Sequence, residues 1–192
     1  MALPQALSFL DPAAISSGDR NVVRTMWDRM SPLPGGKRLF SLAVGRAAAY
    51  TATIGAVVVD LRPGHAEVLM RDRPGVRNHL RSVHAVALVN LAELTGNVAL
   101  AYSLPDDARF IVSGLSIEYV KKARGTITAT SESPIPATNA KSEYQVPVVM
   151  TDAGGEVVAR ATLRTLVGPK TVRGQRSTVA VRTSRAAARD LN

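Results

Sequence analysis

The segment that most constrains the fold is residues 83–103, which is apolar on nearly every side when it is drawn as a helix. A helix of this kind must be covered all round by other elements. Ser82 precedes it and can cap its free amides, and a Pro-Asp-Asp sequence at 105–107 ends it. The sequence therefore predicts one long central helix. Its apolar residues are Val83, Val86, Ala87, Leu88, Val89, Leu91, Ala92, Leu94, Val98, Ala99 and Leu100.

Strand-like segments before and after the predicted helix in the sequence can form a sheet that packs against it. Residues 54–61 are rich in β-branched side chains, and an Arg-Pro-Gly turn then leads to a second strand, 65–71, which predicts a hairpin. Four more strands are expected after the helix, at 110–121, 125–132, 144–151 and 156–167. The predicted fold class is α+β, with an antiparallel sheet of about six strands wrapped around the helix.

Two details of this fold are also predicted. The four late strands should pair in chain order as a meander, and Pro147 should place the third of them at an edge or a bulge, because proline cannot donate to the ladder. Before the first hairpin, apolar residues at spacings of three and four predict amphipathic helices at 19–30 and 37–50.

Three polar residues interrupt the apolar helix, namely Asn90, Glu93 and Asn97. At 100° per residue they lie within about 60° of one another and form one polar stripe. We expect the Glu93 carboxylate to be buried, so that it must be paired, hydrogen-bonded or protonated. Two interpretations stay open: a packing role, or a catalytic site.

The loop before the helix carries groups that suit acyl transfer. Asn78, His79 and His84 lie close to the helix start, where free amides and the positive end of the dipole can hold an oxyanion. Glu93 would act as a general base, the amide near Ala85 would polarise a carbonyl, and Asn78 would position water. His84 should point about 180° away from Glu93 on an ideal helix, so its predicted role is a supporting one. Turn, packing or capping roles are the alternatives for these loop residues.

The sequence Asn78…His84-Ala85…Leu91-Ala92-Glu93 resembles the signature of hotdog-fold acyl-CoA thioesterases, in particular the phenylacetate-pathway type and its 4-hydroxybenzoyl-CoA relatives. Residues 115–125 resemble the strand, basic residues, glycine and strand of the same family, and the resemblance covers about residues 50–168. It departs from the family pattern where His-Gly-Gly is replaced by His84-Ala85-Val86, and where Asn97 replaces Thr or Ser.

The resemblance implies a hotdog fold and thioester hydrolysis. The Ala85 amide would polarise the thioester carbonyl, Glu93 from the same or a facing subunit would activate water or attack directly, and Asn78 would orient the attacking oxygen. It implies a homodimer or homotetramer with a shared acyl pocket, and no cofactor other than the coenzyme A of the substrate.

The remaining predicted substrate-binding residues surround these groups. Ser82, His84, Asn90 and Asn97 are assigned to the acyl site. Five basic residues are candidates for the phosphates of coenzyme A, with ordinary solvated surface as the alternative for each. They are Arg77, Arg81, Lys121, Lys122 and Arg124.

Charge and cysteine content set limits on other functions. The chain has 192 residues, no cysteine, and a net charge of +9. Residues 170–192 hold six basic residues and one acidic residue, hence +5 of that total. We therefore expect an N-terminal extension at 1–18, a hotdog domain with its N-terminal helices at 19–168 (core 50–168), and a flexible basic tail at 169–192, without specific nucleic-acid binding.

The rest of the sequence predicts a cytoplasmic protein. The N-terminus lacks a basic start and an unbroken apolar stretch, so no signal peptide is expected, and no cysteine suggests an oxidising compartment. No membrane span is expected, because polar side chains interrupt both long apolar regions. His65, His79 and His84 lack metal-ligand spacing, so no metal site is predicted.

Four functions are weighed. Thioester hydrolysis is preferred, and the alternative is a hotdog protein that binds an acyl thioester without catalysis, suggested by the two missing glycines. A hydratase or dehydratase is less favoured, because no strand-borne histidine is expected opposite Glu93. Nucleic-acid binding through the tail predicts retention on DNA that depends strongly on salt.

Overall fold

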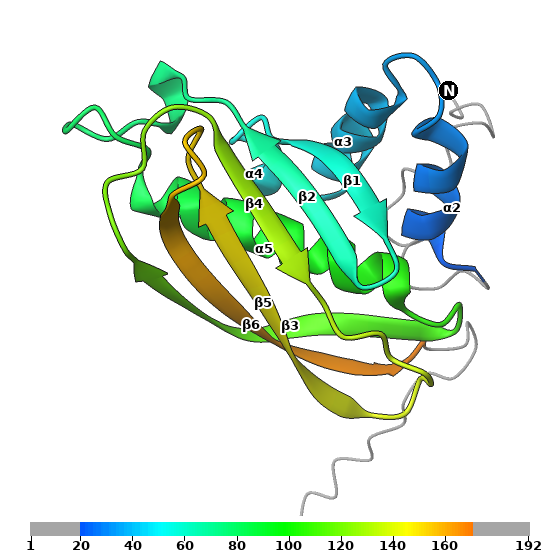
Figure 1. Cartoon of the computed structure of the whole chain (residues 1–192). Helices are drawn as coiled ribbons and strands as arrows, with labels where there is room; N and C mark the ends of the chain where they lie inside the picture. The colour runs from blue at the N-terminus through cyan, green and yellow to red at the C-terminus, as the bar shows by residue number, and fades with distance from the viewer. Residues whose placement is uncertain (1–19, 171–192) are drawn as a thin grey trace, which may run out of the picture.

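The structure is a computed structural model, and it describes residues 20–170. The helices are α2 (Val22–Met30), α3 (Gly36–Ala47), α4 (Ala49–Ala52) and α5 (Ala85–Ser103). The strands are β1 (Val57–Arg62), β2 (His65–Met70), β3 (Ala108–Tyr119), β4 (Ile127–Glu132), β5 (Ser142–Thr151) and β6 (Val157–Pro169). The predicted α+β fold is confirmed: one antiparallel six-stranded sheet packs on one long helix (Figure 1).

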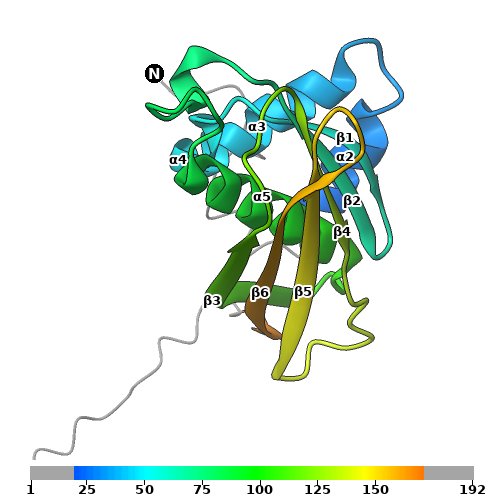
Figure 2. The ribbon, with the colours of Figure 1, turned by 60° about the vertical axis from the view of Figure 1, so that its left-hand side comes forward.

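The sheet curves around α5, which lies against its concave face (Figure 2). The inward faces of the strands are apolar and buried, as in Val58, Val68 and Leu163, and they meet Leu91 and Leu100 of α5, all within one core cluster. By length and composition α5 could cross a membrane, but 67% of it is buried inside the protein. It is therefore the core helix and not a span.

The order of the strands is β1-β2-β4-β5-β6-β3, so the predicted meander is wrong for β3. β3 pairs with β6, from Ala108↔Pro169 to Tyr119↔Ala159, at the far edge of the sheet. The chain then returns past the start of α5 and enters β4 beside the β1–β2 hairpin, whose second strand needs a partner. A period of two residues predicts a strand but not its neighbour, which is why the sequence missed this crossover.

The prediction that Pro147 marks an edge strand or a bulge is also wrong, since Pro147 pairs regularly with Thr162 and the irregularity of β5 lies at Met150/Thr151. β5 lies between β4 and β6 in the sheet. The pairing of β4 with β5 ends at Ser131↔Val148, so Pro147 lies one residue beyond it, where β4 requires no amide.

The N-terminal helices extend the core beyond the sheet. α2 and α3 meet through Trp27 and Phe40, whose rings pack edge to face with centroids 5.1 Å apart. α3 lies beside β1, and the Ser41 hydroxyl accepts a hydrogen bond from the Val58 amide at 2.9 Å. These helices therefore cover a side of the hairpin that the sheet alone leaves open (Figure 1).

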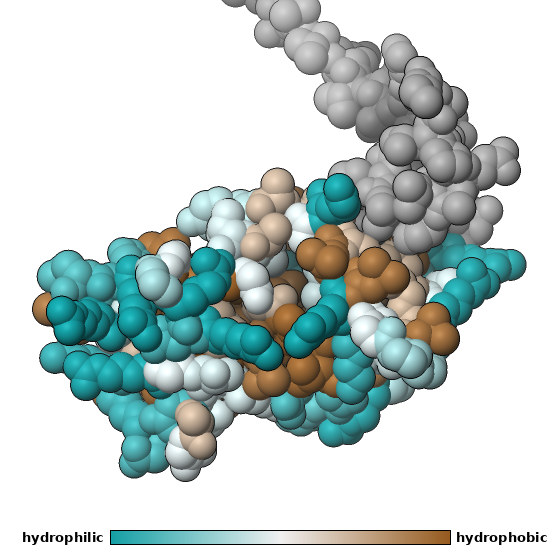
Figure 3. Space-filling model, turned by 90° about the horizontal axis from the view of Figure 1, so that it is seen from above, coloured by the Kyte–Doolittle hydropathy of each residue, from teal (hydrophilic) through white to brown (hydrophobic). Residues whose placement is uncertain are grey.

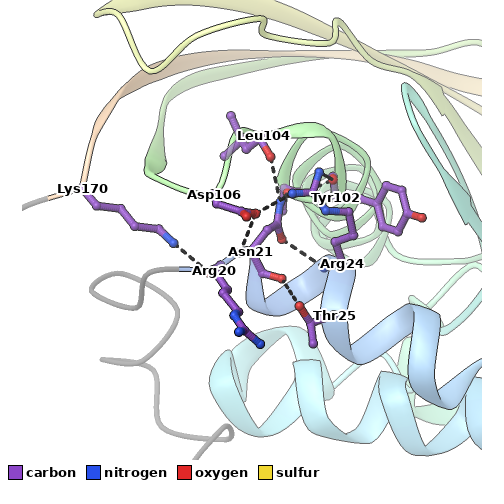
Figure 4. Close-up of polar contacts among 9 residues, drawn as sticks. Arg20, Asn21, Arg24, Thr25, Tyr102, Leu104, Asp106 and Lys170 are labelled. Carbon is purple, nitrogen blue, oxygen red and sulfur yellow. Dashed lines mark hydrogen bonds and ion pairs between the residues drawn. The ribbon is translucent and has the colours of Figure 1, made fainter.

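Hydrogen bonds of Asn21 connect the start of α2 to the end of α5 (Figure 4). Its Nδ2 donates to the carbonyls of Ala101 (2.6 Å) and Leu104 (3.0 Å), while its Oδ1 accepts from the Arg24 amide (3.0 Å) as the N-cap of α2. Its backbone amide donates to Asp106 Oδ1 at 3.0 Å. One buried side chain thus satisfies free backbone groups of two helices.

The predicted terminal segments fall almost wholly outside the described residues. Of the extension at 1–18 nothing is described, and of the tail at 169–192 only the first two residues are described. Pro169 ends β6, and the Lys170 amide donates to the Asp107 carbonyl at 2.7 Å. The sheet thus extends two residues further than the strand predicted at 156–167.

Candidate active site

The start of α5 differs from the prediction. The helix begins at Ala85, and His84 is its N-cap, with Nδ1 accepting from the Val86 amide at 3.1 Å. Ser82 is not the cap, because the Val83 amide donates to the Ala123 carbonyl at 2.9 Å and holds the backbone extended there. The Ala85 amide makes no hydrogen bond to any described residue, so it is free to polarise a carbonyl.

Asn78 builds the loop that leads to the helix. Its Oδ1 accepts from the Leu80 amide (2.9 Å), the Ser82 amide (3.2 Å) and the Ser82 hydroxyl (3.1 Å). This is the turn chemistry that asparagine commonly supplies. The Nδ2 group makes no hydrogen bond within residues 20–170, and it is the part of the side chain that can still contact a substrate.

Asp72, which was not among the predicted site residues, holds the same loop. Its Oδ1 lies 2.6 Å from Arg77 Nε, and its Oδ2 accepts from the Gly125 amide at 3.0 Å. The hydrogen bond from Arg77 lowers the pKa of Asp72, burial opposes it, and the Gly125 amide adds to the lowering. An aspartate five residues before an arginine was the available sequence signal, but the partner amide 53 residues away was not.

Glu93 is exposed in the single chain, so the expectation of a buried carboxylate is wrong. The sheet and the N-terminal helices cover the other faces of α5 and leave open the side that carries Val86 and Glu93. Eight residues separate Ala85 from Glu93, or about 12 Å along the axis and about 80° around it. These two groups of one chain are therefore too far apart to contact one carbonyl group together.

The two asparagines of the stripe have different surroundings. Asn90 is buried and its Nδ2 donates to the Tyr50 carbonyl of α4 at 3.1 Å, so this side chain fixes α4 on α5. Asn97 is half-buried, and its Oδ1 is buried without a hydrogen-bond partner in the described part of the chain. Such an atom is costly unless a ligand or another chain satisfies it.

Two of the five candidate phosphate-binding cations are already paired. Lys121 Nζ contacts Asp152 Oδ2 at 2.7 Å and also bonds to Glu156, and these hydrogen bonds raise the pKa of Lys121. Arg77 is held by Asp72. A phosphate would have to compete with carboxylates for both side chains.

The other three cations lie on the surface near the helix start. Arg81, Lys122 and Arg124 are exposed and form no ion pair with any residue from 20 to 170. The hydrogen bond from Val83 to Ala123 brings the segment with Lys122 and Arg124 beside the loop with Arg81. The structure thus brings together two motifs that lie about 40 residues apart in the sequence.

Tyr119, at the end of β3, is a further contact that the sequence did not suggest. Its hydroxyl donates to the Ala85 carbonyl at 3.3 Å, and burial raises the pKa of Tyr119. This bond ties the edge strand to the first residue of α5.

A six-stranded sheet in this order, wrapped around one long helix, is the hotdog fold, and the predicted resemblance to hotdog thioesterase-like proteins is confirmed. The chain belongs to the family described as "Domain of unknown function (DUF4442)", which matches residues 36–167. No curated protein matches the chain.

Three solved structures show the likeness. The crystal structure of a genomics target is 33% identical, with a TM-score of 0.68 over 78% of this chain and 99% of that chain. A Pseudomonas aeruginosa protein of unknown function, described as a probable thioesterase, is 25% identical, with a TM-score of 0.62 over 71% of this chain and 97% of that one. The E. coli PaaI protein of the phenylacetic acid degradation operon is 18% identical, with a TM-score of 0.57 and coverages of 69% and 93%, and shows the fold alone.

Proposed function

We propose that this protein hydrolyses an acyl-CoA or acyl-carrier thioester in a site that two copies of the chain share. The observation that carries the proposal is the placement of two chemical groups on α5. The unused Ala85 amide and the exposed Glu93 carboxylate both lie at the open side of the helix, yet they cannot meet on one carbonyl within one chain. A second copy would bring its own Glu93 to this Ala85.

The edge strand β3 offers a way for two copies to associate. It is 12 residues long, its inner edge pairs with β6, and its outer edge has no strand partner among residues 20–170. Ile111 on this strand is 66% exposed. A long unpaired edge is a template for another strand, so we expect β3 to pair with β3 of a second copy. The homodimer that results sets two α5 helices side by side, and a homotetramer would join two such dimers.

In this arrangement each group has one task. The Ala85 amide donates a hydrogen bond to the thioester carbonyl and stabilises the negative charge that develops on its oxygen. Glu93 of the facing subunit takes a proton from water as the water attacks the carbonyl carbon, or it attacks directly and forms an anhydride that water then cleaves. The carbon–sulfur bond breaks, and the thiolate leaves and takes up a proton. Asn78 Nδ2 orients the attacking oxygen.

The surroundings of this site suit the nucleotide end of coenzyme A. Arg81, Lys122 and Arg124 place three exposed positive charges around the loop before α5. Cations without carboxylate partners bind phosphate more readily than paired ones, so these three are preferred over Arg77 and Lys121. Asn97 Oδ1, which lacks a partner, can accept a hydrogen bond from the substrate or the second chain.

A second function, thioester binding without hydrolysis, is favoured by one observation. The Val86 amide is already occupied by His84 Nδ1, and the Val86 side chain is 48% exposed at the helix start. Among the described residues, Ala85 thus has the one backbone amide at the start of α5 that remains for the oxyanion. Binding of acyl-CoA with no turnover at any chain length would favour this function. A cytoplasmic location stays a prediction in both cases.

The test is a screen of short, long and aryl acyl-CoAs for release of free thiol, run in parallel with Glu93→Gln. We expect turnover on at least one class, and a drop of about 10²- to 10⁴-fold in the variant, since a positioned base contributes about that factor. Glu93 is exposed and its carboxylate forms no hydrogen bond or ion pair with residues 20–170, so the melting temperature should not change. Unchanged turnover in Glu93→Gln would remove Glu93 from the mechanism.

A further inference from the structure

A hollow of about 610 Å³ lies between α3, α4 and the start of β1, where it reaches Leu94 of α5. Its size falls within the range of about 300–1,000 Å³ that small-molecule sites occupy. Figure 3 shows apolar side chains gathered in the middle of the face seen from above, with hydrophilic side chains around them. Neither Asn78, Ala85 nor Glu93 lines this hollow, so it is a separate feature of the molecule.

The interior of the hollow is apolar and offers a ligand few hydrogen bonds. Apolar side chains from α3, α4 and β1 dominate it, including Leu39, Leu42 and Val57. Ser41 is one of few polar residues there, and its hydroxyl already donates to the Lys37 carbonyl (2.7 Å) and accepts from the Val58 amide. The body of a ligand that fits must therefore be a hydrocarbon.

Two arginines supply the charge of the hollow. Arg38 and Arg46, both on α3, are its titratable lining residues, and no acidic side chain from residues 20–170 lines it. Both side chains are exposed, and neither guanidinium group forms a hydrogen bond or an ion pair with residues 20–170. Two unpaired cations beside an apolar hollow complement a molecule with an anionic head and an apolar tail.

We infer that this hollow binds a single-chain fatty acid, with the hydrocarbon tail between α3 and α4 and the carboxylate at Arg38 or at Arg46, which lie eight residues apart on α3. This inference does not rest on hydrolysis at the start of α5, because it concerns binding alone. A head group without charge would leave the arginines unused, and a branched or polar body would lose contact with the leucines.

The first experiment measures binding of saturated fatty acids to the full chain by displacement of a dansyl-labelled fatty acid. Affinity should rise about fourfold per added methylene until the tail fills the hollow. The double variant Arg38→Gln/Arg46→Gln should weaken fatty-acid binding at least tenfold and leave binding of the matching fatty alcohol unchanged. Arg71→Gln, which removes an exposed arginine outside the hollow, should have no effect.

A second variant tests the position of the tail. Ala52 lines the hollow and lies close to Gly45 of α3. A Cβ added at Gly45 would be 3.0 Å from the Ala52 Cβ, which shows how near the two helices are at this point. A larger side chain at position 52 therefore narrows the space between α3 and α4. Ala52→Phe should abolish binding while Ala49→Phe, an exposed neighbour in α4 that does not line the hollow, retains it. Circular dichroism checks that both variants fold.

Three results would overturn the inference: no binding by the full chain, equal binding in Ala52→Phe and Ala49→Phe, or equal loss of acid and alcohol in the double arginine variant. If the chain binds no fatty acid and Ala52→Phe instead changes the sedimentation coefficient, a second copy of the chain occupies the hollow, and the inference also fails.

Discussion

The two ends of α5 are held in different ways. At its C-terminal end, Asn21 donates to the carbonyls of Ala101 and Leu104, and these residues are buried. At its N-terminal end, His84 satisfies one amide, while Ala85 and Val86 are exposed. A helix end whose carbonyls are held by a buried side chain stabilises the fold, whereas an end with a free amide can bind a substrate. The comparison separates the residues that we expect to affect stability from those that we expect to affect hydrolysis.

The largest expected effect is on hydrolysis, at the N-terminal end of α5, which we call the open end because the Ala85 amide is free there. Ala85→Pro removes the free amide and little else, because proline is favoured at the first position of a helix. The preceding residue, His84, has φ −67° and ψ 139°, which a following proline allows. Hydrolysis should fall about 10²- to 10³-fold, the usual cost of one oxyanion donor, with an unchanged melting temperature.

Steady-state kinetics on the best acyl-CoA measures this loss. Ala85→Gly, which keeps the amide, is the control and should remain within a few-fold of the wild type. If Ala85→Pro hydrolyses as fast as Ala85→Gly, the amide has no part in the reaction.

The next largest effect is on stability, at the C-terminal end of α5, which we call the fastened end because Asn21 binds its carbonyls. Asn21→Ala removes the donor to two buried carbonyls and the cap of α2, which should cost about 2–3 kcal/mol of unfolding free energy. For a domain of this size the melting temperature should fall by about 4–12 °C. Thermal unfolding measures it, with the exposed Gln145→Ala as control. A melting temperature equal to that of the control would mean that the contact between α2 and α5 contributes no stability.

A third effect depends on pH and occurs at both ends. Asp72 holds the loop at the open end, and Asp106 holds Asn21 and Arg24 at the fastened end. Arg77 lowers the pKa of Asp72, and the Asn21 amide is the main cause of the lowered pKa of Asp106. Because the folded pKa lies below the unfolded value of about 3.9, each carboxylate stabilises the fold above that pH, and this stability is lost as the pH falls through the folded pKa.

Asp72→Asn and Asp106→Asn should therefore each reduce the free energy of unfolding at neutral pH, and this reduction should shrink as the pH falls through the folded pKa. Urea unfolding at neutral pH and at about pH 2, well below the unfolded pKa, measures the difference. If each substitution reduces the free energy of unfolding equally at both pH values, the ionised carboxylate contributes no more to stability than the neutral amide that replaces it.

The smallest effect concerns the cap of α5. Aspartate is among the preferred N-cap residues and its charge suits the positive end of the helix dipole, so His84→Asp should add about 0.5–1 kcal/mol of unfolding free energy. His79→Asp changes an exposed histidine of the loop outside the helix and is the control. Chemical unfolding of the pair measures the difference. A loss of stability in His84→Asp would show that the imidazole has a role beyond capping.

Local patterns in the sequence predicted the elements, because each depends on neighbouring residues. The apolar run of α5 and the β-branched run with its Pro-Gly turn gave the central helix and the hairpin within a few residues. The placement of β3 beside β6 depends on contacts between distant segments, and no period reveals it. For the same reason the contact of Asp72 with Gly125 and that of Tyr119 with Ala85, which join segments far apart in the sequence, were missed.

The candidate site was predicted in part. The spacing of Asn78, Ala85 and Glu93 on and before one helix could be read from the sequence, because helical geometry fixes it. The exposure of Glu93 could not, because it depends on which face of α5 the sheet leaves uncovered. The hollow beside α3 could not be predicted either, since it is formed by side chains of five separate elements, α2, α3, α4, β1 and α5.

The most direct test of a site shared between chains is complementation of two inactive variants. Glu93→Gln and Ala85→Pro are mixed, unfolded and refolded together, and thiol release from the acyl-CoA substrate is measured. In a two-fold dimer each mixed pair has one intact site, so random pairing predicts about a quarter of wild-type activity. If the refolded mixture stays as inactive as either variant alone, the two groups do not act across the interface, and the account is contradicted.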